Sequence, residues 1–300
     1  MSITVKHLTK YYGQQTAVNN ISFQAKKGEI LGFLGPNGAG KSTTMKIITG
    51  FIPASEGHVE VCGLDVNEHP IEIRKKIGYL PEHNPLYLDM YVKEYLSFVA
   101  KIYKVKNVKE RVAEMIQKVG LEKEQHKRIG ALSKGYRQRV GLAQAIIHDP
   151  EVLILDEPTS GLDPNQLVDI RALIKKIGEE KTVMLSTHIM QEVEAICDKV
   201  IIIKNGDLVA NNTAAELQNQ TEEVVIYVEF EGDISRNQLK TIENVSRVEK
   251  ISNSAFLLSG NKQNDLRKNI ASFAQKNELL ILTMKVEEKS LEEVFKALTK

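Results

Sequence analysis

The sequence predicts an α/β protein with a small α+β domain at its C-terminal end. Four short apolar runs are separated by segments in which apolar residues recur at helical spacing, which is typical of a parallel sheet with crossover helices. These runs are residues 30–34, 152–155, 182–186 and 200–203. After Asn211 the pattern becomes strand, helix, two strands, helix, strand and a final helix. The β-α-β-β-α-β order predicts a ferredoxin-like domain.

Two further regions complete the predicted organisation. Residues 3–8 and 17–23 read as strands on either side of a turn at Gly13, so we expect an antiparallel sheet near the N-terminus. Between Val92 and Leu121 the apolar residues keep helical spacing, which indicates a helical insert. We therefore expect one domain over residues 1–217, with a helical subdomain at about 85–150, and a second over residues 222–300. The polar stretch 211–221 is the expected boundary.

Composition and charge exclude several classes of partner. Forty basic residues against thirty-nine acidic ones leave a formal net charge of +1, which provides no electrostatic footprint for nucleic acid or an anionic membrane. Two cysteines, Cys62 and Cys197, are too few for a disulfide framework and fit a cytoplasmic setting. No apolar run approaches the ~20 residues needed to cross a bilayer. Any contact with a membrane is therefore expected to come through a partner.

A glycine-rich segment between the first apolar run and a helical pattern fits the phosphate-binding loop. Its residues are Gly35, Pro36, Asn37, Gly38, Ala39, Gly40, Lys41, Ser42 and Thr43. The glycines let backbone N–H groups close on phosphates, and the helix N-terminus adds partial positive charge. We expect Lys41 to reach the β and γ phosphates and the Ser42 hydroxyl to bind Mg²⁺. A phosphate loop alone leaves kinases, GTPases and other ATPases open.

Two carboxylates follow the apolar run 152–155. Asp156 and Glu157 stand at the end of a predicted buried strand, where unpaired charges are costly. We expect Asp156 to hold Mg²⁺, directly or through water, and Glu157 to polarise the attacking water as a general base. The alternative interpretation is a strand that simply ends in an acidic turn.

Further motifs resemble the ABC ATPase family over residues 3 to about 217. Residues 132–136, Leu-Ser-Lys-Gly-Tyr, are similar to its signature motif, and residues 160–163, Ser-Gly-Leu-Asp, resemble its D-loop. His188 resembles its switch histidine, and Tyr12 resembles its adenine-stacking aromatic residue. The resemblance implies a P-loop NTPase cassette with a RecA-like core, an antiparallel β subdomain and a helical subdomain. It also implies an ATPase that uses ATP and Mg²⁺.

The same resemblance implies a partner cassette. In this family two cassettes pair head to tail, so ATP on the phosphate loop of one is also clamped by the signature motif of the other. The resemblance therefore implies that Ser133 and Gly135 bind the ATP of a second copy and that Asp163, in the D-loop, belongs to the nucleotide site, and a homodimer is expected. Serine is also an ordinary N-cap, so Ser133 could serve the helix after it as well. Separate transmembrane permease subunits are the other implied partners, with the chain peripheral on the inner face of the membrane.

Three positions depart from the common motifs of the family. Lys134 stands where glycine is commoner, Tyr136 where glutamine is commoner, and Glu82 at the usual glutamine. An ionised Glu82 cannot donate a hydrogen bond, but it can accept one from a metal-bound water. We therefore predict that Glu82 contributes to the Mg²⁺ site together with Ser42 and Asp156. Either Tyr11 or Tyr12 could stack on adenine, but not both, because neighbouring residues on a strand face opposite ways. We expect Tyr12 to be the stacking residue.

We interpret the chain as the ATP-hydrolysing subunit of an exporter. The added C-terminal domain, with residues 290–295 near its end, resembles multidrug and lipid exporters of the family. The rival is a family member that acts on nucleic acid or ribosomes, where two cassettes share one chain or a long coiled coil separates the motifs; residues 41–133 leave no room for such an arm. A non-enzymatic nucleotide sensor conflicts with the complete hydrolytic set that includes Glu157.

Overall fold

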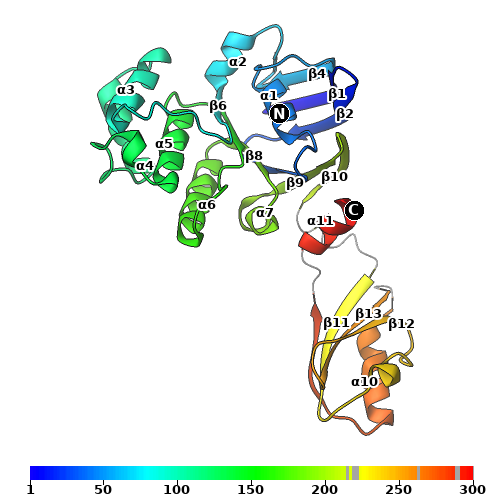
Figure 1. Ribbon diagram of the computed structural model, residues 1–300. Helices are drawn as coiled ribbons and strands as arrows, with labels where there is room; N and C mark the ends of the chain where they lie inside the picture. Colours follow the sequence, from blue (N-terminus) through cyan, green and yellow to red (C-terminus); the bar gives the residue numbers. More distant parts are fainter. Residues whose placement is uncertain (214–215, 218–222, 262–263, 288–290, 300) are drawn as a thin grey trace. The chain divides into compact units, whose positions relative to one another are not determined.

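The computed structural model describes residues 1–213, 216–217, 223–261, 264–287 and 291–299. It divides into two compact units, the first from Met1 to Ala214 and the second from Ala215 to Leu298 (Figure 1). The expected boundary between residues 217 and 222 therefore falls largely on residues outside those ranges. Among the described residues, no helix has both the length and the apolar character needed to span a membrane.

The first unit begins with an antiparallel sheet in the order β2-β1-β4-β5. The hairpin of β1 (Ile3–Tyr12) and β2 (Gln15–Ala25) was predicted, and Gly13 in its turn has a φ of +58°. The strands β4 (Glu56–Val61) and β5 (Leu64–Asp65) were not predicted. β4 pairs with β1 and extends the sheet beyond the hairpin.

The second sheet of this unit is the predicted α/β sheet, in the order β10-β9-β3-β8-β7-β6. Its strands are β3 (Ile30–Leu34), β6 (Ile77–Leu80), β7 (Val152–Asp156), β8 (Thr182–Thr187), β9 (Lys199–Lys204) and β10 (Asp207–Thr213). All neighbours are parallel except β9 and β10. Because parallel strands end at one edge, the segments after β3, β7 and β8 meet there.

Strand β6 was missed because it is only four residues long and lacks an alternating pattern. Its Gly78 is required by close packing, since a Cβ there would lie 2.0 Å from the backbone oxygen of Ala145. The loop after β6 carries Glu82 toward the same edge of the sheet, where Glu82 lines the cleft described below.

Helices cover the second sheet and form the predicted insert. Helices α1 (Lys41–Ile48), α2 (Pro70–Lys76), α5 (Lys134–Ile146), α6 (Pro164–Gly178) and α7 (Met190–Ile196) belong to the first unit, with the single turn η1 (Ile129–Ala131) before α5. The insert contains α3 (Val92–Ile102) and α4 (Val108–Lys118), as the spacing predicted. One apolar core joins α3, α4 and α5 to β7 and β8.

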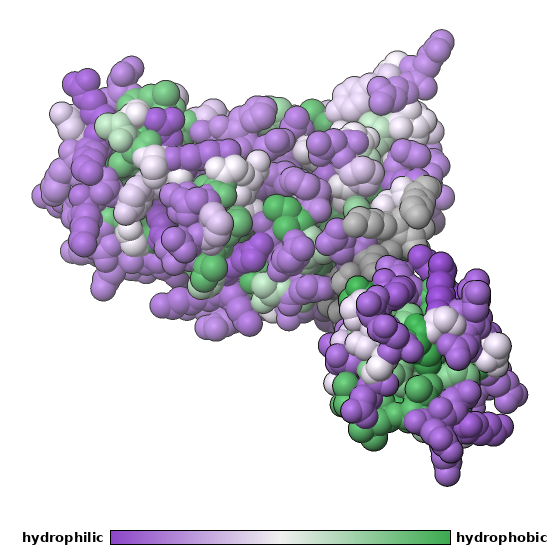
Figure 2. Space-filling model, turned by 60° about the horizontal axis from the view of Figure 1, so that its bottom comes forward, coloured by the Kyte–Doolittle hydropathy of each residue, from purple (hydrophilic) through white to green (hydrophobic). Residues whose placement is uncertain are grey.

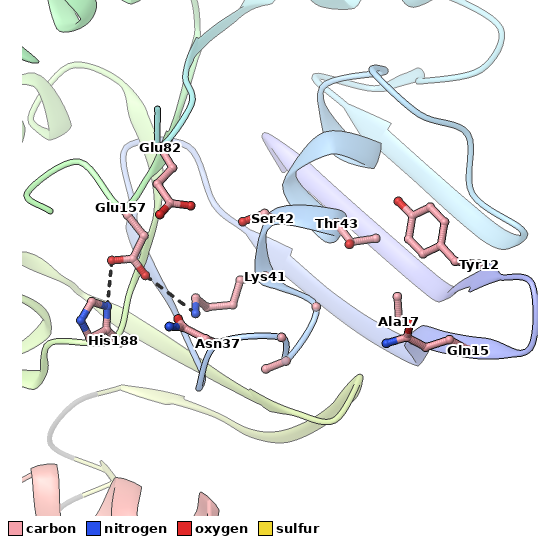
Figure 3. Close-up of a pocket in the computed structure, with 13 residues that line it drawn as sticks. Tyr12, Gln15, Ala17, Asn37, Lys41, Ser42, Thr43, Glu82, Glu157 and His188 are labelled. Carbon is pink, nitrogen blue, oxygen red and sulfur yellow. Dashed lines mark hydrogen bonds and ion pairs between the residues drawn. The ribbon is translucent and has the colours of Figure 1, made fainter. Parts of the chain in front are cut away.

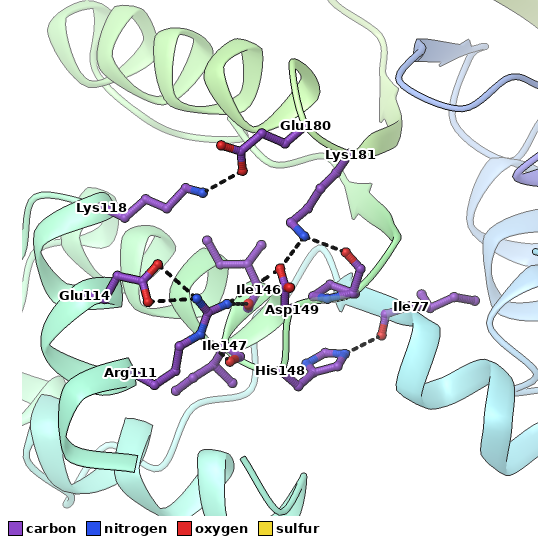
Figure 4. Close-up of polar contacts among 11 residues, drawn as sticks. Ile77, Arg111, Glu114, Lys118, Ile146, Ile147, His148, Asp149, Glu180 and Lys181 are labelled. Atoms are coloured by element: carbon purple, nitrogen blue, oxygen red, sulfur yellow. Dashed lines mark hydrogen bonds and ion pairs between the residues drawn. The ribbon is translucent and has the colours of Figure 1, made fainter. Parts of the chain in front are cut away.

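Polar contacts fix α4 to the C-terminal end of α5. Arg111 donates hydrogen bonds to the carbonyl oxygens of Ile146 (3.0 Å) and Ile147 (2.8 Å), and also to Glu114 (Figure 4). The last carbonyls of a helix have no partner within the helix. Arg111 therefore satisfies groups that would otherwise be left unpaired as α5 ends.

The second unit has its own sheet and core. Its elements are β11 (Glu223–Phe230), α9 (Arg236–Leu239), β12 (Val245–Lys250), β13 (Ala255–Asn261), α10 (Leu266–Lys276), β14 (Ile281–Glu287) and α11 (Leu291–Thr299). The order β12-β13-β11-β14, antiparallel throughout, and the chain order are those of the predicted ferredoxin-like domain. The first helix after β11 was expected over residues 234–242, but α9 has only four residues; Ser235 and Gln238 form a capping box that starts it at Arg236.

Apolar side chains also remain exposed on this unit, where Figure 2 shows green surface. Four of the exposed residues lie at or on the edge strand β14, namely Leu280, Leu282, Met284 and Val286. The core itself is formed by buried residues that include Phe230, Phe256 and Leu258.

Candidate functional site

The glycine-rich segment 35–43 connects β3 to α1 and bends tightly against neighbouring backbone. Gly38 and Gly40 have φ values of +79° and +106°, which glycine adopts without strain. A Cβ at Gly35 would lie 2.4 Å from the carbonyl oxygen of Ile203, and one at Gly40 would lie 2.4 Å from that of Ala17. The loop then enters α1 at Lys41, so its backbone amides and the helix N-terminus face one cleft.

Lys41 places a buried ammonium group at the centre of this cleft. Its Nζ donates hydrogen bonds to the carbonyl oxygens of Gly35 (2.8 Å) and Pro36 (3.3 Å) and lies 3.8 Å from Glu157 Oε1. Burial lowers the pKa of Lys41, while the negative charges of Glu157 and Asp156 act in the opposite direction. An incoming phosphate would supply the anionic partner that a buried cation needs.

Glu157 and His188 form a hydrogen-bonded pair across the cleft (Figure 3). His188 Nδ1 is 3.0 Å from Glu157 Oε2, so the imidazole proton lies on Nδ1 when the carboxylate is ionised. Burial raises the pKa of Glu157, and the contacts with His188 and Lys41 lower it in part. Glu157 has a φ of +49°, a left-handed backbone that is uncommon for a residue with a side chain. Such strain is frequent at functional sites.

Asp156 is held by a residue that the sequence did not indicate. Ser186 donates a hydrogen bond of 2.6 Å to Asp156 Oδ1 and accepts one of 3.0 Å from the backbone amide of Glu157. Ser186 lies two positions before His188 at the end of β8. The available signal for this role was a serine that follows the apolar residues 183–185 within a buried strand.

A cleft of about 410 Å³ brings most predicted residues together. Its lining consists of Tyr12, Gln15, Ala17, Asn37, Gly38, Ala39, Gly40, Lys41, Ser42, Thr43, Glu82, Glu157 and His188. Gln15 and Ala17, on β2, were not predicted. Tyr12 is half-exposed and lines the cleft, whereas Tyr11 is not among the lining residues that the structure describes. An aromatic face at this end can stack on a base.

The oxygen donors of the site fit Mg²⁺. Ser42 and Glu82 line the cleft, whereas Asp156 is buried next to the lining residue Glu157 and is bonded at Oδ1 by Ser186. Within the described ranges, no cluster of three histidine, cysteine or acidic residues forms a metal site by itself. Mg²⁺ prefers oxygen ligands, usually keeps several waters and is bound by one or two carboxylates together with substrate phosphates.

The signature and D-loop residues lie outside this cleft. Ser133 is the N-cap of α5 and accepts a hydrogen bond of 3.4 Å from the amide of Tyr136. Asp163 caps α6 and accepts from the Gln166 amide at 3.0 Å. A Cβ at Gly135 would lie 2.5 Å from the side-chain amide of Gln166, so only glycine fits there without movement of Gln166. The same chain thus does not bring these residues to its own phosphate loop.

Comparisons with known proteins show the family of the chain. The family described as ABC transporter matches residues 18–160. The linearmycin resistance ATP-binding protein LnrL of Bacillus subtilis is 33% identical over 99% of this chain and 98% of its own. The bacitracin transport ATP-binding protein BcrA of Bacillus licheniformis is 38% identical over 77% of this chain and 76% of its own.

Solved structures show the same relationship. The structure of an ATP-binding subunit of an ABC transporter has a TM-score of 0.67 and 29% identity, and covers 73% of this chain and 93% of its own. The dimeric structure of a post-hydrolysis state of an ATP-binding cassette, bound to ADP and Pi, has a TM-score of 0.65 and 27% identity. The match covers 70% of this chain and 98% of that cassette.

Proposed function

The chain belongs to the ATP-binding, ATP-hydrolysing subunits of ABC transporters, and on that premise we propose that it dimerises around Mg²⁺-ATP and drives export through separate permease subunits. The observation that carries the proposal is the convergence of Lys41, Glu157 and His188 in one cleft with the phosphate loop. A cation for the phosphates, a base for water and a histidine at the reacting end are the groups that hydrolysis requires.

Each group has a proposed role at the triphosphate. Lys41 exchanges its carbonyl and Glu157 contacts for the β and γ phosphates, and residues 35–43 donate backbone hydrogen bonds. Glu157 accepts a proton from the attacking water, while His188 orients the γ-phosphate and the water. Ser42, Asp156 and Glu82 would hold Mg²⁺, directly or through water. The ion supplies charge neutralisation for the phosphates.

The residues outside the cleft support action in a second copy. Ser133 and Gly135 lie at the N-terminus of α5, where hydroxyl and amide donors suit a phosphate anion, and Asp163 is the N-cap of α6. We propose a head-to-tail homodimer in which these residues complete the partner's site. The similarity to a dimeric cassette structure supports this arrangement.

A mixing experiment tests the composite site. Ser133→Arg blocks the donor surface and Lys41→Ala blocks the acceptor cleft, so a heterodimer of the two variants contains one intact site. We expect each variant alone to lack ATP turnover and the mixture to regain part of it. Heterodimers detected by orthogonal affinity tags without any regained turnover would refute action across the interface.

An apolar groove offers a docking site for the permease subunit. It has a volume of about 520 Å³, and its lining includes the exposed Phe51 together with Tyr103 and Pro81. Pro81 lines this groove and the adjoining Glu82 lines the nucleotide cleft. A helix from a cytoplasmic loop of the permease, seated here at the inner face of the membrane, would be coupled to the nucleotide by two consecutive residues.

The docking proposal is tested with Phe51→Ser and the complete transporter. We expect normal basal turnover of the variant chain and loss of the stimulation that permease-containing membranes give to the native chain. Full stimulation of Phe51→Ser would contradict the proposal.

Relatives named for linearmycin resistance and Nod factor export support export as the direction of transport.

We further propose that the second unit is an accessory domain that regulates or stabilises the dimer. Its core is formed by residues between 224 and 281, whereas the two cores of the first unit include, among the residues that the structure describes, none beyond Leu208. None of the residues that line the nucleotide cleft belongs to the second unit within the described ranges. We therefore expect the first unit to bind nucleotide without the second unit.

A further inference from the structure

A buried carboxylate lies behind the catalytic pair and takes no part in the roles assigned above. Glu192, in the first turn of α7, is 1% exposed. Burial of an ionised group is costly unless it is paired and hydrogen-bonded. Glu192 is therefore not an ordinary surface charge on a helix, and its buried carboxylate requires specific partners.

Both oxygens of this carboxylate are bound by side chains from two different segments. Thr159 donates to Oε1 and Thr187 donates to Oε2 at 2.6 Å. The guanidinium of Arg171, on α6, lies 3.7 Å from Oε1, and its buried Nε has no hydrogen-bond partner among the described residues. Both threonine side chains are almost completely buried. The arrangement is a closed polar cluster within the apolar interior.

The two threonines stand beside the two members of the catalytic pair. Thr159 is two residues after Glu157 in the turn that follows β7, and Thr187 directly precedes His188 at the end of β8. Thr187 also accepts a hydrogen bond of 3.0 Å from the amide of Ile189, which fixes the chain on the other side of His188. One carboxylate thus joins the backbone segment of the base to that of the histidine.

We propose that Glu192 is a positioning residue for ATP hydrolysis, which ties the turn carrying Glu157 to the strand end carrying His188. The inference rests on the proposed roles of Glu157 and His188. The 3.0 Å contact between them needs both segments held in register, because Glu157 sits on left-handed backbone and the His188 side chain is 53% exposed. A displacement of about 1 Å at such a pair costs as much as ~10²-fold in rate.

The linkage is tested in the full-length chain with Glu192→Gln and Thr159→Val. The first removes the charge that binds both hydroxyls, and the second removes one hydroxyl at nearly constant volume. Each is expected to lower kcat about tenfold, the lower end for loss of a hydrogen bond to an ionised group, with little change in KM for ATP. Glu179→Gln, an exposed carboxylate at the end of α6, is the matched control.

Combination with His188→Ala separates positioning from general structural support. If Glu192 acts through the histidine, Glu192→Gln should reduce kcat by less than about twofold on the His188→Ala background. A full tenfold further loss in the double variant overturns the inference. So does a loss of ATP affinity and thermal stability in both single variants, since that pattern reports a fold defect.

Lys41→Ala distinguishes this inference from the proposed function. Native turnover in Lys41→Ala would overturn both, because the cleft would then not be the hydrolytic site. Abolished turnover in Lys41→Ala, together with fully multiplicative losses in the Glu192→Gln and His188→Ala pair, would overturn the positioning role alone.

Discussion

Replacement of Glu157 by glutamine isolates the chemical step from nucleotide binding. The side chain is 9% exposed and contacts Lys41 Nζ at 3.8 Å and His188 Nδ1 at 3.0 Å. Glutamine keeps the shape and an acceptor oxygen for either contact, but it cannot take a proton from water. The fold and the cleft should therefore be retained.

The magnitude follows from the role and the charges. A positioned general base contributes about 10²–10⁴-fold, or about 2.7–5.4 kcal/mol of the barrier. Two opposite charges 3.8 Å apart attract by about 4 kcal/mol at an effective dielectric constant of 20. A γ-phosphate beside Lys41 experiences the same carboxylate as repulsion, so Glu157→Gln should bind ATP at least as tightly as the native chain.

Two measurements decide the outcome. Steady-state ATP hydrolysis should fall at least 100-fold, and size-exclusion chromatography with ATP and Mg²⁺ should show a long-lived dimer. Glu179→Gln serves as the control for removal of a glutamate charge far from the cleft. Turnover within twofold of native would refute the role of Glu157 as general base. Monomeric elution at high protein concentration with ATP would argue against the proposed head-to-tail homodimer.

Other perturbations test separate parts of the site. Lys41→Ala should abolish turnover and leave the thermal unfolding temperature near native, as measured by ATPase assay and calorimetry; normal turnover would exclude the lysine. Gly40→Ala should weaken ATP binding at least tenfold in titration calorimetry, because a Cβ would meet the Ala17 carbonyl at 2.4 Å, and unchanged binding would show that the loop can shift. Burial raises the pKa of Glu157 above its usual value, so kcat should begin to fall at a higher pH than it would for an exposed glutamate. His188→Ala removes a group that lowers this pKa and should move the acid limb of the pH profile to still higher pH. An acid limb that moves to lower pH would contradict the pairing. A chain ending at residue 220 should still bind ATP with near-native affinity, and a folded truncation without binding would show that the second unit contributes to the cleft.

Local pattern in the sequence was sufficient for the phosphate loop and the two-part fold. Gly35 to Thr43 form one continuous segment whose chemistry depends on backbone conformation, and that conformation is encoded by adjacent glycines. The elements of the second unit were predicted because each carries its own apolar periodicity, and the structure follows the predicted order. Strand β6 has only four residues and is stabilised by pairing with β7, so local pattern was insufficient there.

Long-range pairing decided the rest of the site. Asp156, Ser186 and His188 come from β7 and the end of β8, and their contacts exist because these strands are parallel neighbours that end at one edge. Ser186 and Glu192 carry no sequence motif by themselves; they act through side chains that lie close only after the sheet forms. Local motifs were therefore sufficient to predict the groups that we propose for the chemistry, because each motif is a continuous segment of the chain. The tertiary structure determined which buried polar groups hold them in place, because hydrogen bonds across strands depend on register and not on spacing along the chain.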